Sequence, residues 1–198
     1  ETKWVLIVSI NPAAPNGGSG TQYFLGDFDG KKFSLDTDFK TQLQRQKAVW
    51  LDYGRDNYAG VTWSDVPQSD GRRLFMGWMS NWDYAQVVPT ESWRSAMTIA
   101  RNLVLKKTNL GYRLFSEPVK EVATLNKDTT LFKFDPHGHY LQPIAKDRKI
   151  VGKVTLNFSY TEGTDGMVVL QLSNSKKEQY FVGYLTTTNQ FISSRNTA

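Results

Sequence analysis

Two runs of apolar and aromatic residues decide the fold, and they lie in residues 4–30, which read WVLIVSINPAAPNGGSGTQYFLGDFDG. Residues 4–10 and 21–28 are rich in β-branched and aromatic side chains, the types that favour β-strands. Residues 11–20 between them contain Pro, Asn and Gly, and Asp29-Gly30 after the second run is a strong hairpin signal. The chain is therefore predicted to begin with two strands joined by a loop, and to turn back after the second.

Short apolar and aromatic runs separated by turn residues continue through the first part of the chain. Further candidate strands are residues 48–52, 58–63, 73–78, 97–105 and 112–115, and only residues 38–45 resemble a short helix. Short strands at intervals of roughly 8–12 residues, with turn signals between them, predict an all-β sandwich, barrel or propeller. About eight strands would suffice for two four-stranded propeller blades, although the count alone does not separate a propeller from a sandwich.

Near Ser116 the apolar runs give way to polar sequence, which predicts a connection between two domains. Residues 117–122 and 126–130 are polar and weakly periodic. Beyond them, antiparallel strands are predicted over residues 153–160, 167–172, 180–185 and 190–193. Polar and apolar side chains alternate in the first of these runs, so one of its faces is expected to pack on a core.

The composition excludes several kinds of chemistry. The 198 residues contain no cysteine, which excludes disulfides, a thiolate nucleophile and zinc-ribbon sites, and His137 and His139 are too few for an all-histidine metal centre. The net charge is +5, but the Lys and Arg residues are spread along the chain rather than clustered for nucleic acid. No apolar run approaches the roughly 20 residues of a membrane helix. We therefore predict no metal, no cofactor, no nucleic-acid partner and no membrane partner.

The two ends of the sequence do not resemble targeting segments. Residues 1–10 lack a basic region followed by an apolar stretch and a cleavage site, and residues 190–195 look like another strand. We expect a piece of a longer protein; the alternative is a mature chain trimmed at both ends.

The side chains richest in chemistry lie in residues 50–63, WLDYGRDNYAGVTW, and in residues 75–84, FMGWMSNWDY. Carboxylates, amides and indoles together suit a sugar, because Asp and Asn bond to its hydroxyls while a C–H face of the ring lies on Trp. The alternative is that Asp52 and Asp56 lie in a turn and the tryptophans fill the core, since aromatic side chains are usually buried anchors.

The order of several motifs resembles that of glycoside hydrolase family 32, which holds levanases, exo-inulinases and invertases. The resemblance covers nearly all of residues 1–120, and residues 129–198 look like the first half of the family's C-terminal β-sandwich. The matching blocks are WVL and SINP within 4–12, GTQYF and GDFDG within 20–30, DYG and YA within 52–59, GWMSNW at 77–82, PT and WRSAM within 89–97, and RNL at 101–103.

The resemblance implies the last blades of a five-bladed β-propeller, followed by part of a C-terminal β-sandwich. The expected domains are a partial propeller of about two blades over residues 1–118, a linker over 119–130 and a partial sandwich over 131–198. The active site of the family lies at the mouth of the propeller's central channel. The implied partners are a fructan or a sucrose-type carbohydrate and a missing N-terminal part of the same propeller, and the implied location is secreted or periplasmic in a bacterium.

The family's retaining mechanism uses one carboxylate as nucleophile, a second as acid/base and a third that stabilises the transition state. In the family these lie in Asn-Asp-Pro, Glu-Cys and Arg-Asp-Pro motifs, and none of the three occurs here; the only Asp-Pro is Asp135-Pro136, preceded by Phe134. We therefore assign no catalytic residue to this chain, and expect the chain alone to be inactive.

The resemblance assigns a partial substrate wall to five residues. Trp82 and Asn81 would lie near the fructosyl pocket, Asp52 would contact sugar hydroxyls at the channel mouth, and Arg55 or Asp56 would lie at an outer subsite. For Arg55 the alternative is a solvated charge in a turn. Two further interpretations stay open for the chain: a freestanding, non-catalytic carbohydrate-binding protein, and a fragment that reassociates with a missing N-terminal part because exposed blade edges must pair.

Overall fold

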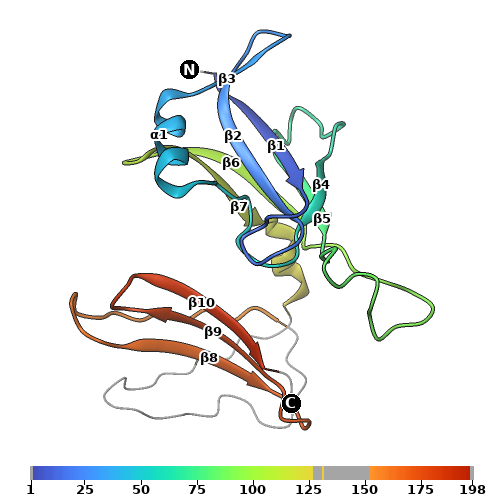
Figure 1. Cartoon of the computed structure of the whole chain (residues 1–198), viewed down its shortest axis with the longest axis vertical. Coiled ribbons are helices and arrows are strands. Elements are labelled where there is room, and N and C mark those ends of the chain that lie inside the picture. Colours follow the sequence, from blue (N-terminus) through green and yellow to red (C-terminus); the bar gives the residue numbers. More distant parts are fainter. Residues whose placement is uncertain (1, 127–130, 132–151, 197–198) are drawn as a thin grey trace. The chain divides into compact units, whose positions relative to one another are not determined.

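The computed structural model describes residues 2–126, 131 and 152–196, which form two compact units, 1–137 and 138–198 (Figure 1). The described residues form three antiparallel sheets, one α-helix and one 3₁₀ helix. The all-β prediction is therefore confirmed.

The first sheet contains β1 (Trp4–Ile10), β2 (Gly20–Phe28) and β3 (Phe33–Leu35), in that order. The register of β1 on β2 runs from Trp4 opposite Gly26 to Ile10 opposite Gly20, so the predicted strands and loop are confirmed. The strand β3 was not predicted, since three residues are too short for a periodic signal. It pairs with β2 in antiparallel register, and at Gly26 the two strands are so close that a Cβ atom would lie 2.0 Å from the Ser34 carbonyl oxygen.

The helix α1 (Thr37–Gln46) follows β3 and includes the predicted residues 38–45. It begins at Asp36, whose Oδ1 accepts hydrogen bonds from the backbone N–H groups of Asp38 (3.0 Å) and Phe39 (3.2 Å). Lys3 lies 2.9 Å from the same carboxylate, and its hydrogen bond lowers the pKa of Asp36 more than burial raises it. Phe39 is the buried side chain through which α1 packs on the core.

Replacing Asp36 with alanine is expected to lower the free energy of unfolding by about 1–2 kcal/mol, because two N–H groups at the start of α1 lose their acceptor and the ion pair with Lys3 is lost. Urea denaturation followed by circular dichroism measures the change. Asp38→Ala in the same helical turn is the control, with an expected effect below about 0.5 kcal/mol. Equal effects of the two changes would contradict the capping role.

The second sheet is a four-stranded meander in chain order: β4 (Tyr58–Thr62), β5 (Arg73–Trp78), β6 (Arg101–Thr108) and β7 (Gly111–Pro118). A four-stranded antiparallel sheet of this kind is the building unit of a β-propeller. The predicted strand 97–105 begins later than expected, at Arg101, because Met97 forms only an isolated bridge with Trp78. The number of blades stays a prediction.

Two predicted strands are wrong. Residues 48–52 pair with β2 only at the isolated bridge between Gln22 and Trp50, which is too little for a strand. Residues 153–160 form no strand, and it is their side chains that contact β9: the Phe158 and Tyr184 rings lie 5.7 Å apart, and the Tyr160 and Tyr184 hydroxyl oxygens lie 2.9 Å apart.

The predicted linker contains the 3₁₀ helix η1 (Lys120–Leu125). Arg72 holds this helix against the turn before β5, since its guanidinium bonds to Asp70 at 2.6 and 2.7 Å and to Glu121 at 2.9 Å. This arrangement lowers the pKa of Asp70 to about 2. Residues 127–130 lie outside the described residues, and the domain boundaries at 118 and 131 stay predictions.

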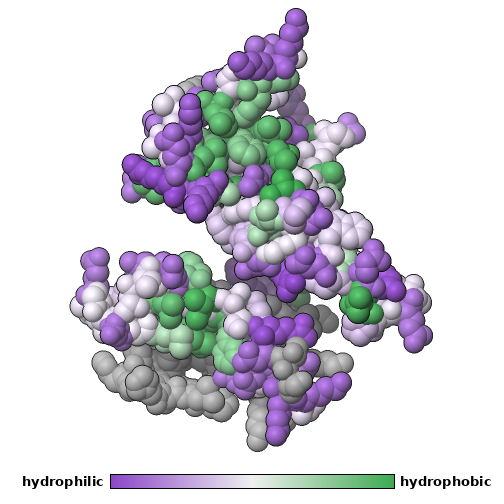
Figure 2. Space-filling model, in the orientation of Figure 1, coloured by the Kyte–Doolittle hydropathy of each residue, from purple (hydrophilic) through white to green (hydrophobic). Residues whose placement is uncertain are grey.

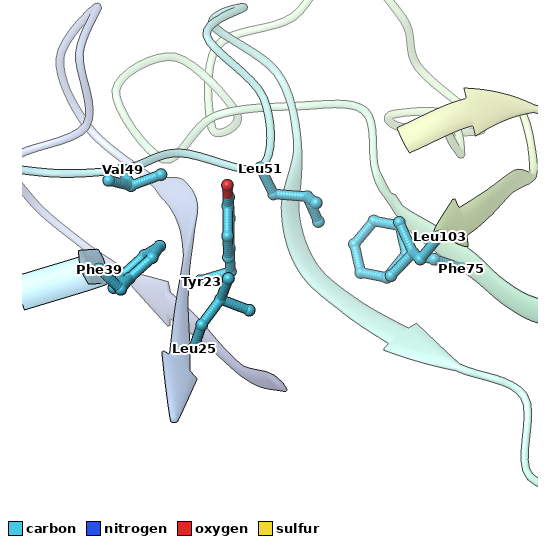
Figure 3. Close-up of a cluster of buried hydrophobic side chains, with 7 residues drawn as sticks. All are labelled: Tyr23, Leu25, Phe39, Val49, Leu51, Phe75 and Leu103. Carbon is cyan, nitrogen blue, oxygen red and sulfur yellow. The ribbon is translucent and has the colours of Figure 1, made fainter. Parts of the chain in front are cut away.

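One hydrophobic core joins both sheets of the first unit to α1 (Figure 3). Phe75 of β5 is completely buried, and the β4 backbone passes over its ring at Gly60, where a Cβ atom would lie 2.1 Å from Phe75 Cζ. Because the core spans the two sheets, it fixes the loops that connect them. Its members are Tyr23, Leu25, Phe39, Val49, Leu51, Phe75 and Leu103.

Figure 2 also shows hydrophobic surface on this unit over β1 and β2, where Trp4 and Leu6 are exposed.

The second unit contains one antiparallel sheet of β8 (Met167–Ser173), β9 (Gln179–Leu185) and β10 (Gln190–Asn196). The strand order is β10-β9-β8, with Phe191 opposite Tyr184 and Leu170 opposite Val182. The three strands predicted over residues 167–193 are confirmed.

Candidate functional site

Asn81 lies at the centre of the predicted site and ties three segments together. Its side chain is completely buried. Its Nδ2 donates to the carbonyl oxygens of Gly17 (3.0 Å), Ser19 (3.2 Å) and Arg55 (2.9 Å). Its Oδ1 accepts from the backbone N–H groups of Ser19 (3.2 Å) and Asp83 (3.0 Å). All of the amide's polar atoms are therefore engaged by the backbone, so Asn81 does not present them to a ligand in this structure.

The loop between β1 and β2 reaches Asn81 because it contains glycine. Gly17 and Gly18 have φ values of +84° and +61°, in the left-handed region that glycine tolerates. A Cβ atom on Gly18 would lie 1.9 Å from Asn81 Oδ1, which no side chain permits. The glycine run thus allows the β1–β2 loop to lie directly against Asn81. The run forms a hairpin loop, as predicted.

The Trp82 side chain is half-exposed, with 47% of its surface accessible. Its backbone N–H donates to Ser19 Oγ at 3.1 Å, so the loop 16–19 also holds Trp82. The Trp82 ring lies 5.2 Å from that of Trp78, which lies 6.3 Å from that of Tyr58. We call Tyr58, Trp78 and Trp82 the Trp82 surface. In it, the accessible Trp82 ring packs on two further aromatic rings.

Arg55 and Asp56 lie beside Tyr84. The Arg55 guanidinium lies 5.4 Å from the centre of the Tyr84 ring and 3.4 Å from Asp83 Oδ2, and both charged side chains are exposed. An exposed pair of this kind contributes little to stability. Burial raises the pKa of Tyr84, and the nearby Asp56 carboxylate raises it further. The Arg55 side chain is accessible to a ligand, whereas Asp56 is partly buried.

Asp52 is held by three neighbours. Its Oδ2 lies 2.8 Å from Arg101 Nη2 and accepts from Asn57 Nδ2 at 3.2 Å, while its Oδ1 accepts from the Gly54 backbone N–H at 2.8 Å. Asp52 lines a cavity together with Trp50 and Arg101, and Trp82 is not among the residues that line it. Asp52 and Trp82 thus do not line one cavity, and their joint contact with a substrate stays a prediction.

The described residues contain no group of three or more His, Cys, Asp or Glu side chains that could hold a metal ion. His137, His139 and Asp135 lie outside the described part of the chain. Within that part, no helix is long and apolar enough to cross a membrane.

Comparison with known proteins decides the family. The model of the "Glycosyl hydrolases family 32 N-terminal domain" matches residues 1–118, more than half of the chain. The chain belongs to glycoside hydrolase family 32. Its sequence is 50% identical over 187 residues to a levanase of Bacillus subtilis, covering 93% of this chain and 26% of the relative. It is 32% identical over 205 residues to an extracellular exo-inulinase of Meyerozyma guilliermondii, covering 98% and 38%.

Solved structures of family 32 proteins have the same fold. The exo-inulinase of Aspergillus awamori superposes with a TM-score of 0.68 at 26% identity, covering 98% of this chain and 38% of that one. A fructofuranosidase of Schwanniomyces occidentalis complexed with fructosylnystose also gives 0.68, at 27% identity, with 100% and 39% covered. The fold class predicted from the family is thereby confirmed. The chain spans about a quarter to two fifths of the length of these relatives.

Three residues that support the candidate site were not predicted from the sequence. Asn57 and Ser19 are buried polar residues that connect the predicted site segments, and Arg101 holds Asp52. The Arg-Asn-Leu block at 101–103 was a signal for Arg101, because it belongs to the matched motifs. No sequence signal distinguishes a buried asparagine from an exposed one.

Proposed function

We propose that this chain is part of a retaining family 32 hydrolase that releases fructose from β-fructosides such as levan, inulin or sucrose, and that it supplies one wall of the substrate site. The observation that carries the proposal is the half-exposed Trp82 ring, held by Trp78 and by the loop that Asn81 fixes. A rigid aromatic face suits the C–H face of a sugar ring. The levanase and exo-inulinase relatives support the substrate class.

Each predicted site residue has a separate role in this proposal. Trp82 stacks on the sugar, and Arg55 donates to hydroxyl groups of an outer sugar unit. Asn81 positions the loops 16–19 and 52–57 rather than contacting the substrate. Asp52 and Asp56 line the surrounding surface, with Asp52 oriented by Arg101.

The nucleophile and the acid/base belong, in this proposal, to a part of the propeller outside this chain. Asn-Asp-Pro, Glu-Cys and Arg-Asp-Pro motifs are absent from the 198 residues. Acid/base and nucleophilic roles require groups within hydrogen-bond reach of the bond that breaks, and binding alone does not replace them. The complete protein is proposed to be secreted or periplasmic, in line with its extracellular relatives.

Replacing Trp82 with alanine tests the substrate wall. The wild-type chain is expected to bind a β-fructo-oligosaccharide in isothermal titration calorimetry, and Trp82→Ala to raise the Kd about thirtyfold, the loss of roughly 2 kcal/mol expected for a central aromatic contact. Trp63→Ala is the matched control, because Trp63 is similarly exposed (44% against 47%) but lies beyond the far end of β4 from Tyr58. No binding by wild type, or equal losses in both variants, would contradict the assignment.

A second candidate function is a freestanding carbohydrate-binding protein, which the accessible Trp82 and the absent catalytic motifs favour. The two functions differ when the preceding propeller part of a family 32 relative is added. A hydrolase part is expected to reassociate and restore fructose release, whereas a binding protein binds the sugar with no gain in hydrolysis. Fructose release by the 198-residue chain alone would contradict both.

A further inference from the structure

We propose that the cavity beside Trp50 is a second carbohydrate site, which binds a neutral sugar unit separately from Trp82. This inference rests on the proposed function for its ligand class. The cavity, which we call the Trp50 cleft, lies between α1, the segment 49–53 and the strands β6 and β7. Its volume of about 440 Å³ falls within the range of small-molecule sites.

The first argument is a buried acceptor in the wall of the Trp50 cleft. Gln42 of α1 lines the cleft, and its Nε2 donates to Gln46 Oε1 at 3.1 Å. Its own Oε1 is buried and accepts no hydrogen bond from the described residues. An unpaired buried acceptor of this kind is destabilising, and a hydroxyl group in the cleft would satisfy it.

The second argument is a set of donors around the same space. The Tyr23 oxygen accepts from the Leu114 backbone N–H at 3.3 Å, which leaves its own hydrogen to donate. The Arg113 guanidinium donates from Nη1 to the Tyr112 carbonyl oxygen at 2.7 Å, and its other N–H groups have no partner among the described residues. Sugar hydroxyls, which both donate and accept, match this mixture of groups.

The lining combines aromatic surface with a single uncompensated cation, and it is the aromatic surface that suits a sugar ring rather than an inorganic anion. Arg101 is compensated by Asp52 at 2.8 Å, so Arg113 is the one cation of the lining without an ion pair in the described structure. Burial raises the pKa of Tyr23, and Arg113 offsets only part of that rise, so the phenol stays neutral at pH 7. Trp50 and Phe115 supply aromatic surface on the lining.

The Trp50 cleft is distinct from the Trp82 surface. Trp82 contacts Trp78 and Ser19, and none of these three residues lines the cleft. Two sites on one protein raise its avidity for a polymer, because the second binding event is intramolecular. Levan and inulin are polymers, so the cleft would favour long substrates over sucrose.

The test follows the indole N–H signals of Trp50 and Trp82 by two-dimensional NMR while fructose, and then a fructo-oligosaccharide, is added to the 198-residue chain. The Trp50 signal is expected to shift and saturate with the sugar. Gln42→Leu is expected to raise the Kd read at Trp50 at least tenfold and to leave the Kd read at Trp82 unchanged. Gln44→Leu is the matched control on the exposed side of α1, with no change at either signal. If Gln42→Leu fails to fold, Arg113→Met takes its place.

The outcomes separate this inference from the proposed function. A saturating shift at Trp82 with none at Trp50 overturns the cleft and leaves the proposed function standing. A shift at Trp50 with none at Trp82 supports the cleft and contradicts the Trp82 wall. A shift at Trp50 with inorganic phosphate but not with sugars, or an equal Kd in Gln42→Leu and wild type, overturns the neutral sugar site.

Discussion

Replacing Asn81 with leucine is expected to lower the free energy of unfolding by about 3–5 kcal/mol, the largest effect of any polar substitution in the first unit. The change leaves three carbonyl oxygens and two N–H groups without their partner. Each such buried group costs about 1–3 kcal/mol if nothing replaces the bond, and relaxation of the loops keeps the total below the sum. Urea denaturation followed by tryptophan fluorescence measures the change.

The control is Asn16→Leu, in the same loop as two of the Asn81 partners. Asn16 donates one exposed hydrogen bond, from Nδ2 to the Tyr53 carbonyl oxygen, so its loss is expected to cost about 1 kcal/mol or less. Asn81→Leu should also weaken fructo-oligosaccharide binding at Trp82, because Ser19 then no longer holds the Trp82 backbone. Equal destabilisation by the two variants would show that Asn81 is not the centre of the network.

Replacing Phe75 with alanine is expected to cost about 3–5 kcal/mol, since it opens a cavity at the junction of the two sheets. Phe75, drawn in Figure 3, has no accessible surface. The β4 backbone approaches its ring at Gly60. Phe75 belongs to a core whose side chains come from both sheets and from α1, so the core cannot readily close over the space. Urea denaturation measures the loss.

The matched control for Phe75 is Phe28→Ala. Phe28 is exposed on β2 and has one ring contact, edge to face with Trp4 at 5.4 Å, so its loss is expected to cost about 1 kcal/mol. A loss at Phe75 as small as that at Phe28 would mean that the two sheets do not share a core.

Most strands could be predicted because their signal is local. Residues 4–10 and 73–78 combine β-branched or aromatic residues with turn signals at both ends, and they form β1 and β5 with the predicted bounds. Residues 48–52 and 153–160 carry a similar pattern without forming strands. A strand requires a partner along its length, and pairing depends on residues far away in the sequence.

The sequence singled out the segments of the candidate site, but not how their individual side chains are engaged. The segments around Asp52 and Trp82 stood out by their carboxylates, amides and indoles, and the structure connects them through Asn81 and Arg55. The division between the Trp82 surface and the Trp50 cleft had no sequence signal. It depends on which way each side chain points when the two sheets pack, which is set by contacts between distant segments.

The sequence by itself determined the all-β class, the kinship with family 32 and the absence of cysteine chemistry, because alternation, motif order and composition are properties of the chain read in order. Only the tertiary structure decided which polar groups are free to meet a ligand. Asn81 and Trp82 are neighbours in sequence. The Asn81 amide is hydrogen-bonded to backbone groups up to 64 residues away, whereas the Trp82 ring is half-exposed. Hydrogen bonds are short and directional, so their partners are known only once the segments that carry them have been brought together.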